Sequence, residues 1–224
     1  MDLFNGINRR EVLKYLGHRG GEVDKSISDK IDETEKLLID TLQPKVCHAV
    51  FAVESRTPLL FSGSNVRFGG EDIKKHLENS DSVIFMAATL GYEADALLRK
   101  LSVKNMADAV IFDACASSAI ENVCDNYTAY LESVYAEKGL FLTDRFSPGY
   151  GDMPLSDQSY LIDALNTQKR IGLCLNRSMM LEPVKSVTAV IGISKTLPQK
   201  RSGCESCSNI AGCKFREKGE VCYE

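Results

Sequence analysis

Four of the eight cysteines lie close together, at Cys204, Cys207, Cys213 and Cys222. The first two have the C-x2-C spacing with which paired thiolates bind one metal ion or cluster, and the later two could complete a four-thiolate site. Thiolate ligands suit an iron–sulfur cluster or zinc, and a redox dithiol or an unliganded tail are further alternatives. The spacing does not choose among them.

A second candidate is the turn-rich segment Arg145-Phe-Ser-Pro-Gly-Tyr150. An arginine offers a planar fork to a carboxylate, Gly149 lets the backbone approach a ligand, and Tyr150 adds an aromatic ring with a polar tip. The alternative is an ordinary surface turn with a solvated arginine. The segment is not a dinucleotide-binding fingerprint, because Pro154 stands where the third glycine would be.

Glu121 is a third candidate, in a stretch from 104 to 137 without glycine or proline that predicts one long helix. It stands at an apolar-to-polar boundary, where a half-buried carboxylate could face a cationic ligand; an exposed helical glutamate is the alternative. The three histidines are isolated, so we interpret them as surface or satisfied core residues. The remaining cysteines are interpreted as small buried hydrophobic residues: Cys47, Cys115, Cys124 and Cys174.

These residues must be positioned by a mixture of helices and strands. Apolar spacing predicts an α+β fold with a twisted, mainly antiparallel sheet flanked by helices, one of them long and central. We expect a domain over residues 1–198 and a small cysteine-rich tail over 199–224. The predicted helices cover 8–17, 26–42, 71–78, 92–101, 104–137 and 156–165, and the predicted strands cover 46–53, 66–68, 82–89, 140–146, 171–175 and 184–194. The first helix begins with Asn8-Arg9-Arg10-Glu11, which resembles a capping box.

Composition narrows the functional classes. The chain has 224 residues, 44% of them hydrophobic and 26% charged, with 27 basic against 31 acidic side chains, so a soluble globular domain is expected and an extended nucleic-acid groove is not. Apolar runs are too short for a membrane span, and the first residues do not resemble a signal peptide, so a cytoplasmic protein is expected. The C-x3-C-x2-C motif of radical S-adenosylmethionine enzymes and the P-loop are both missing.

One further pattern follows the arginine turn at fixed spacing. Arg145-x-x-Pro148-Gly149-Tyr150 is followed by Ile171-Gly172-Leu173-x-Leu175-x-x-Ser178-x-Met180-x-x-Pro183-x-x-Ser186-Val187. This order resembles the reactivation domain of vitamin B12-dependent methionine synthase. Upstream, the segments 11–17, 87–91 and 113–121 are similar to stand-alone members of that family, so the resemblance covers most of residues 8–194.

The resemblance implies a protein that binds S-adenosylmethionine and supports reductive methylation of cob(II)alamin. It implies that Arg145 holds the methionyl carboxylate, that Ser147 and Gly149 contact the ligand, that Tyr150 stands where ligand and cobalamin meet as the catalytic residue, and that Glu121 lies near the methionyl amine. One arginine and one glutamate complement the carboxylate and the cationic groups of this ligand.

The chain also departs from the family pattern. Asn176-Arg177-Ser178 replaces the usual Thr-Glu-Ser, which reverses a charge, and residues 195–200 lack the tyrosine found after the last strand. The chain has no Asp-x-His-x-x-Gly cobalamin motif. The cobalamin is therefore expected on a separate corrinoid protein, such as a methionine synthase or a related methyltransferase, with flavodoxin or ferredoxin as electron donor.

Three hypotheses result. The first is a stand-alone reactivation protein, an accessory component of a corrinoid methyltransferase, whose tail cluster passes electrons. The second is a non-catalytic module that docks on a corrinoid protein and carries a zinc-stabilised tail. The third is a corrinoid-linked methyltransferase with another methyl donor. Binding of S-adenosylmethionine separates the first from the second, and methylation of cob(I)alamin without S-adenosylmethionine identifies the third.

Overall fold

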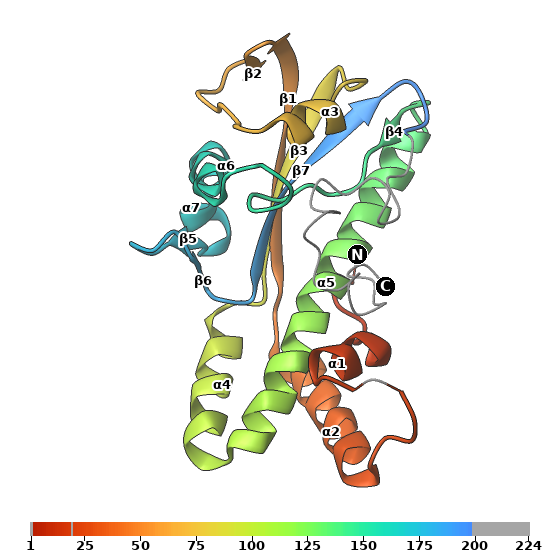
Figure 1. The fold of residues 1–224 in the computed structure, drawn as a ribbon, viewed down its shortest axis with the longest axis vertical. Helices are drawn as coiled ribbons and strands as arrows, with labels where there is room; N and C mark the ends of the chain where they lie inside the picture. The colour runs from red at the N-terminus through yellow and green to blue at the C-terminus, as the bar shows by residue number, and fades with distance from the viewer. Residues whose placement is uncertain (1, 19, 199–224) are drawn as a thin grey trace. The chain divides into compact units, whose positions relative to one another are not determined.

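A computed structural model describes residues 2–18 and 20–198. Its seven α-helices within these ranges include the 31-residue helix α5, as the absence of glycine and proline predicts (Figure 1). None of the described helices is both long and apolar enough to cross a membrane. The helices are α1 (Arg9–Tyr15), α2 (Lys25–Thr41), α3 (Glu71–His76), α4 (Tyr92–Lys104), α5 (Met106–Ala136), α6 (Gln158–Leu165) and α7 (Thr167–Ile171).

Five strands form the main sheet, in the order β2-β1-β3-β7-β4, and β5 and β6 form a separate hairpin. β2 pairs antiparallel with β1, and β4 pairs antiparallel with β7. β3 and β7 also run in opposite directions, because hydrogen bonds join Asp81 to Ile193 at one end and Leu90 to Lys185 at the other. The strands are β1 (Lys45–Arg56), β2 (Leu59–Phe61), β3 (Ser82–Thr89), β4 (Phe141–Leu142), β5 (Cys174–Leu175), β6 (Leu181–Glu182) and β7 (Ser186–Ser194). The predicted α+β class is confirmed.

The described chain divides into two compact units, each made of three separate segments. The first holds residues 2–47, 87–131 and 167–187, and the second holds 48–86, 132–166 and 188–198. Each unit has its own buried residues and is treated separately below.

The first unit is mainly helical. Asn8 caps α1 by accepting hydrogen bonds from the Arg10 and Glu11 amides, as its position before the helix predicts. The Glu11 carboxylate does not close a capping box; it accepts a hydrogen bond from Ser118 of α5, whose hydroxyl also accepts from the Asn8 amide. The N-terminal segment is thereby tied to α5. Small residues on α5 allow this close packing, with Ala116 and Ala119 fully buried.

The second unit has an aromatic core under the sheet. Phe85 of β3 packs against Phe61 of β2 with ring centroids 5.1 Å apart and against Phe51 of β1 at 4.6 Å. Phe68 completes the cluster, 5.5 Å from Phe85 and nearly perpendicular to it. Edge-to-face contacts of this kind add to the burial of the rings. Phe68 therefore serves the core from a loop, and the strand predicted over 66–68 is not formed.

The strand predicted over 171–175 is also wrong in part. Ile171 ends helix α7, and only Cys174 and Leu175 are in a strand. Gly172, with a φ of 74°, takes the left-handed conformation that stops a helix, and the buried Thr167 hydroxyl donates to the Leu173 carbonyl at 2.7 Å. The apolar run thus contains a helix end.

Candidate functional site

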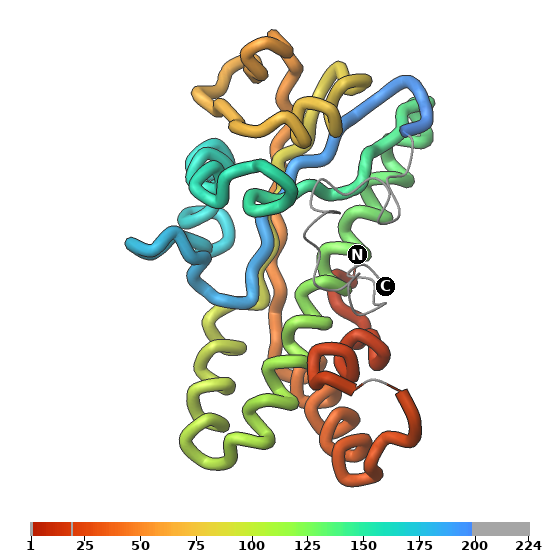
Figure 2. The backbone as a smooth tube through the Cα atoms, viewed as in Figure 1, coloured from red at the N-terminus to blue at the C-terminus, as the bar shows by residue number. Residues whose placement is uncertain are grey.

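The arginine turn lies between β4 and α6, where the chain doubles back on itself (Figure 2). We call residues 145–152 the 145–152 loop. It holds four of the predicted ligand-binding residues, and all four belong to the second unit: Arg145, Ser147, Gly149 and Tyr150. Tyr150 is 58% exposed, and Arg145 and Ser147 are half-buried. The loop therefore presents an aromatic ring and an arginine without burying either.

A bulge in the sheet edge places Arg145. Leu142 pairs with Ile193, Thr143 bonds to Gly192, and the chain pairs again only at Phe146 with Val190. Asp144 and Arg145 together face a single residue of β7, so the strand predicted over 140–146 is interrupted. Bulges re-aim side chains and often stand beside functional sites. This bulge directs the chain from the sheet edge into the loop.

Backbone hydrogen bonds between residues close in sequence hold the loop in a folded turn. The Tyr150 amide donates to the Ser147 carbonyl, the Met153 amide to the Tyr150 carbonyl, and the Gly149 amide to the Met153 carbonyl, each at 3.0 Å. Gly149 has a φ of 92°, which favours glycine because it lacks a Cβ. Met153 is 2% exposed and anchors the turn in the core. The loop is thus a folded turn with a defined backbone.

The residues just before the loop, and Phe146 within it, contact the last residue of α3. His76 Nε2 lies 2.9 Å from the Asp144 carbonyl oxygen and 2.9 Å from the Thr143 hydroxyl. The His76 ring packs on Phe146 with centroids 5.1 Å apart, and Phe146 in turn packs edge-on against Tyr150 at 6.2 Å. This histidine is therefore a satisfied structural residue, as expected, and it supports the ring stack that reaches Tyr150.

The end of the loop contacts the first residues of α3. Asp152 accepts hydrogen bonds from the Glu71 amide at 2.7 Å and the Asp72 amide at 3.0 Å. These two bonds hold the pKa of the Asp152 carboxyl below its ordinary value. The backbones approach closely here: a Cβ at Gly70 would lie 2.5 Å from Asp152 Oδ1 and 2.9 Å from its carbonyl oxygen, and a Cβ at Gly151 would overlap the Asp72 carboxylate.

The fifth predicted ligand-binding residue, Glu121, lies in the first unit on α5 and is half-buried. It follows Asp113 and Ser117 along the same face of the helix, at intervals of four residues. Lys185 Nζ contacts both of these residues, at 2.8 Å from Asp113 Oδ1 and 2.7 Å from Ser117 Oγ. Asp113 and Ser117 of α5 therefore already bind one ammonium group, that of Lys185, whose side chain is only 13% exposed.

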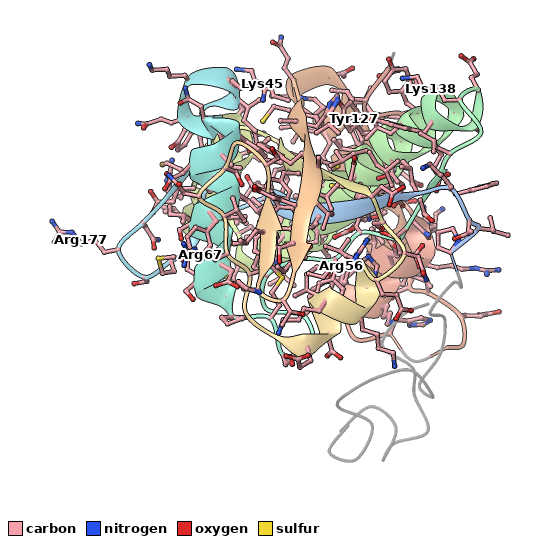
Figure 3. All side chains as sticks on the ribbon, turned by 90° about the horizontal axis from the view of Figure 1, so that it is seen from above. Lys45, Arg56, Arg67, Tyr127, Lys138 and Arg177 are labelled. Carbon is pink, nitrogen blue, oxygen red and sulfur yellow. The ribbon has the colours of Figure 1, made fainter. Side chains whose placement is uncertain are left out.

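The β5–β6 pair forms a second turn in the first unit, which we call the 174–182 hairpin. Asn176 organises it: its Oδ1 accepts from the Ser178 and Met180 amides at 2.9 and 3.1 Å, and its Nδ2 donates to the Glu182 carboxylate at 3.1 Å. Arg177, at the tip, is exposed and points away from the hairpin (Figure 3). The charge that departs from the family pattern is thus carried on a solvated side chain.

The four cysteines predicted to bind metal, Cys204, Cys207, Cys213 and Cys222, lie outside the described residues. Within the described residues, no group of His, Cys, Asp and Glu could hold a metal ion. Of the other cysteines, Cys47, Cys115 and Cys124 are buried as predicted. Burial raises the pKa of Cys115 to about 12, so this thiol is not a nucleophile. Cys174 is the exception: it is half-buried, with its Sγ 3.9 Å from the Tyr92 hydroxyl.

Several residues that shape these sites were not identified from the sequence. Asp152, Asp157 and Lys185 act on partners more than sixty residues away in the chain. One sequence feature could have indicated this contact: the pair Gly69-Gly70 stands before a short helix, and adjacent glycines indicate a close backbone approach. Nothing in the sequence indicates which carboxylate approaches them.

No protein-family model matches the sequence, and no curated protein sequence matches it. Among solved structures, the fold is similar to the MetH reactivation domain bound to AdoHcy, with a TM-score of 0.61 and 15% sequence identity. The match covers 96% of this chain and 82% of the solved chain. It agrees with the α+β architecture described above, and at this identity it shows likeness of fold.

Proposed function

We propose that this protein binds S-adenosylmethionine through the 145–152 loop and supports reductive methylation of cob(II)alamin on a separate corrinoid protein. The observation that carries the proposal is the agreement of two independent features. The arginine motif forms a folded, anchored turn, and the fold as a whole is similar to a reactivation domain that was solved with AdoHcy, the demethylated product of this ligand.

The proposed ligand has complementary chemistry to the loop. Its methionyl carboxylate matches the guanidinium fork of Arg145, which can donate two parallel hydrogen bonds. The left-handed backbone at Gly149 and the exposed ring of Tyr150 are available for contact with the ligand and with the partner's corrin. We propose Ser147 as a backbone contact and Glu121 as the acid for the methionyl amine, the latter from the resemblance in sequence.

The bound ligand would supply the methyl group, which leaves its sulfonium sulfur for the reduced cobalt of the partner. The residues of this chain then have a positioning role: they hold the methyl group in line with its acceptor, which converts an encounter of two molecules into an oriented contact. The corrin and an external one-electron donor, for which we propose flavodoxin or ferredoxin, carry the redox chemistry.

Calorimetric titration of S-adenosylmethionine into anaerobically purified protein tests the proposal. Saturable binding is expected, and Arg145→Ala should raise the dissociation constant about 30-fold, which corresponds to about 2 kcal/mol for a lost charged hydrogen-bonded pair. Arg99→Ala is the control, because Arg99 is an exposed residue of α4. Wild type that does not bind, even beside a cobalamin-loaded partner, would overturn the proposal and favour the docking module.

We propose separately that Cys204, Cys207, Cys213 and Cys222 bind an iron–sulfur cluster, with zinc as the alternative. Two C-x2-C thiolates followed by two more supply the four ligands that such a cluster requires. Brown anaerobic protein with stoichiometric iron and sulfide is the expected result, and colourless protein with one zinc per chain would contradict the cluster. Cys207→Ser should lower the metal content, whereas Cys174→Ser, outside the tail, should leave it unchanged.

A further inference from the structure

Helix α3 contacts the 145–152 loop with its first turn, and its last residue contacts Asp144 just before the loop and the Phe146 ring within it. At the first turn, the Glu71 and Asp72 amides donate to Asp152, and at the last residue, His76 lies within hydrogen-bond distance of the Asp144 carbonyl. The two contacts flank the segment that carries Arg145 and Tyr150. A helix of six residues thus spans the whole loop as a clamp.

The helix is itself fixed to the sheet at its far end. Arg56 lies at the end of β1 (Figure 3) and donates hydrogen bonds from Nη1 to the Leu77 carbonyl and from Nη2 to the Ser80 carbonyl, each at 2.7 Å. These carbonyls belong to the turn that ends α3, where a cation is favourable. A second hydrogen bond holds the chain just before the first residue of α3: the Gly69 amide donates to the buried Asp157 carboxylate at 2.7 Å.

The chain of contacts ends next to Tyr150. Asp152 lies two residues beyond Tyr150, and the Met153 amide that follows it donates to the Tyr150 carbonyl at 3.0 Å. A shift of Asp152 away from α3 therefore moves the turn that sets the Tyr150 backbone. Gly70 and Gly151 allow the loop and α3 to approach this closely, because a Cβ on either residue would overlap the opposite carboxylate.

We infer that Asp152 is a positioning residue for the ligand loop and acts through α3, which Arg56 fixes to the sheet. The inference rests on the proposed function for the ligand that the loop receives, and on the contacts above for its geometry. Asp152 is not proposed to touch the ligand. Its carboxylate is occupied by two backbone amides, so its effect on binding is to preset the backbone of the loop before the ligand arrives.

The test uses the full-length protein and three variants. Asp152→Ala removes both acceptors, and Asp152→Asn keeps one accepting oxygen as a conservative rescue. Asp24→Ala is the matched control, because Asp24 caps α2 with the same chemistry, accepting from the Ser26 amide at 2.7 Å, but it belongs to the other unit. Each variant is titrated with S-adenosylmethionine, and amide hydrogen exchange is measured at Gly149, Tyr150 and Met153.

For Asp152→Ala we expect a roughly tenfold higher dissociation constant and faster exchange at the three loop amides, with Asp152→Asn intermediate in both. Asp24→Ala should lower the melting temperature by a few degrees and change neither quantity. Unchanged loop exchange and unchanged affinity in Asp152→Ala, beside a wild type that binds, would overturn the inference.

The loop exchange also separates this inference from the proposed function. Suppose that the wild type does not bind S-adenosylmethionine, but that Asp152→Ala speeds hydrogen exchange at the loop amides. This result would overturn the proposed ligand and support the positioning role of Asp152. If Asp24→Ala weakened binding as much as Asp152→Ala, the effect would be one of global stability, and the positioning role would be wrong.

Discussion

The 145–152 loop and the 174–182 hairpin are both compact turns with exposed side chains at their tips, but they are held in opposite ways. The loop depends on partners distant in the chain: Asp152 bonds to residues about eighty positions earlier. The tip of the hairpin is held by its own residues, because the three hydrogen bonds of the Asn176 side chain all join residues 176–182. Its contacts with other elements lie at its base: Cys174 Sγ is 3.9 Å from the Tyr92 hydroxyl of α4, and Lys185, just beyond the hairpin, contacts Asp113 of α5.

This difference determines how each turn responds to change. The locally bonded tip of a hairpin closes a short segment at small entropic cost, and this tip can open without disturbing other elements. A turn held through α3 has the same conformation only while the helix, Arg56 and the sheet edge stay in place. The loop is therefore preset by the fold, which suits a segment that must receive a ligand in one geometry.

The largest effect is expected where the loop meets α3. Gly70 has φ 94° and ψ 151°, a region populated almost only by glycine, and an added Cβ would meet Asp152. Gly70→Ala should lower the free energy of unfolding by about 3 kcal/mol, from backbone strain and overpacking together. Chemical denaturation measures this change.

Gly139→Ala is the matched control for that substitution. Gly139 also has a positive φ, at 68°, but a Cβ there would meet nothing within 4 Å. It should cost only about 1 kcal/mol, the strain of the left-handed conformation. Equal costs at the two glycines would show that the approach of loop and helix carries no special constraint.

The next largest effect concerns the base of the hairpin. Lys185 is only 13% exposed, whereas its partner Asp113 is 50% exposed. Asp113→Ala would leave a nearly buried ammonium with a single hydroxyl partner, and it should cost about 2 kcal/mol of unfolding free energy. Lys185→Met should cost less, because the carboxylate left behind is hydrated. Denaturation of both variants measures the asymmetry, and the reverse order would contradict it.

A smaller effect is expected at the tip of the hairpin. Asn176→Ala removes three hydrogen bonds of a partly exposed side chain and should cost about 1 kcal/mol. Hydrogen exchange should accelerate at the Ser178 and Met180 amides, whereas the Tyr150 and Met153 amides of the loop should keep their protection. If the loop amides also lost protection, the hairpin would not be the self-contained turn described here.

The same contrast explains what the sequence could and could not predict. Local signals identified α1 with its Asn8 cap, the long α5 and the buried strand β3, because each is determined by neighbouring residues. The arginine turn was recognised from its residue types. The residues that anchor this turn could not be recognised in the same way. The bulge at Asp144 and the hydrogen bond between Asp152 and α3 depend on contacts that only the folded chain creates.

The smallest expected effect is a difference in acid sensitivity. The Glu71 and Asp72 amides hold the pKa of the Asp152 carboxyl below its ordinary value, so the ionised carboxylate favours the clamped loop. Because the folded pKa is the lower one, this contribution is complete above the unfolded pKa and is lost as pH falls through the folded pKa.

The Asn176 amide does not titrate. Below about pH 4, exchange at Tyr150 and Met153 should therefore rise relative to Ser178 and Met180, once the intrinsic pH dependence is removed. In Asp152→Asn the relative rise should disappear, since the amide has no charge to lose. A rise that persisted in this variant would assign the acid sensitivity to another carboxylate and break the link between Asp152 and the loop.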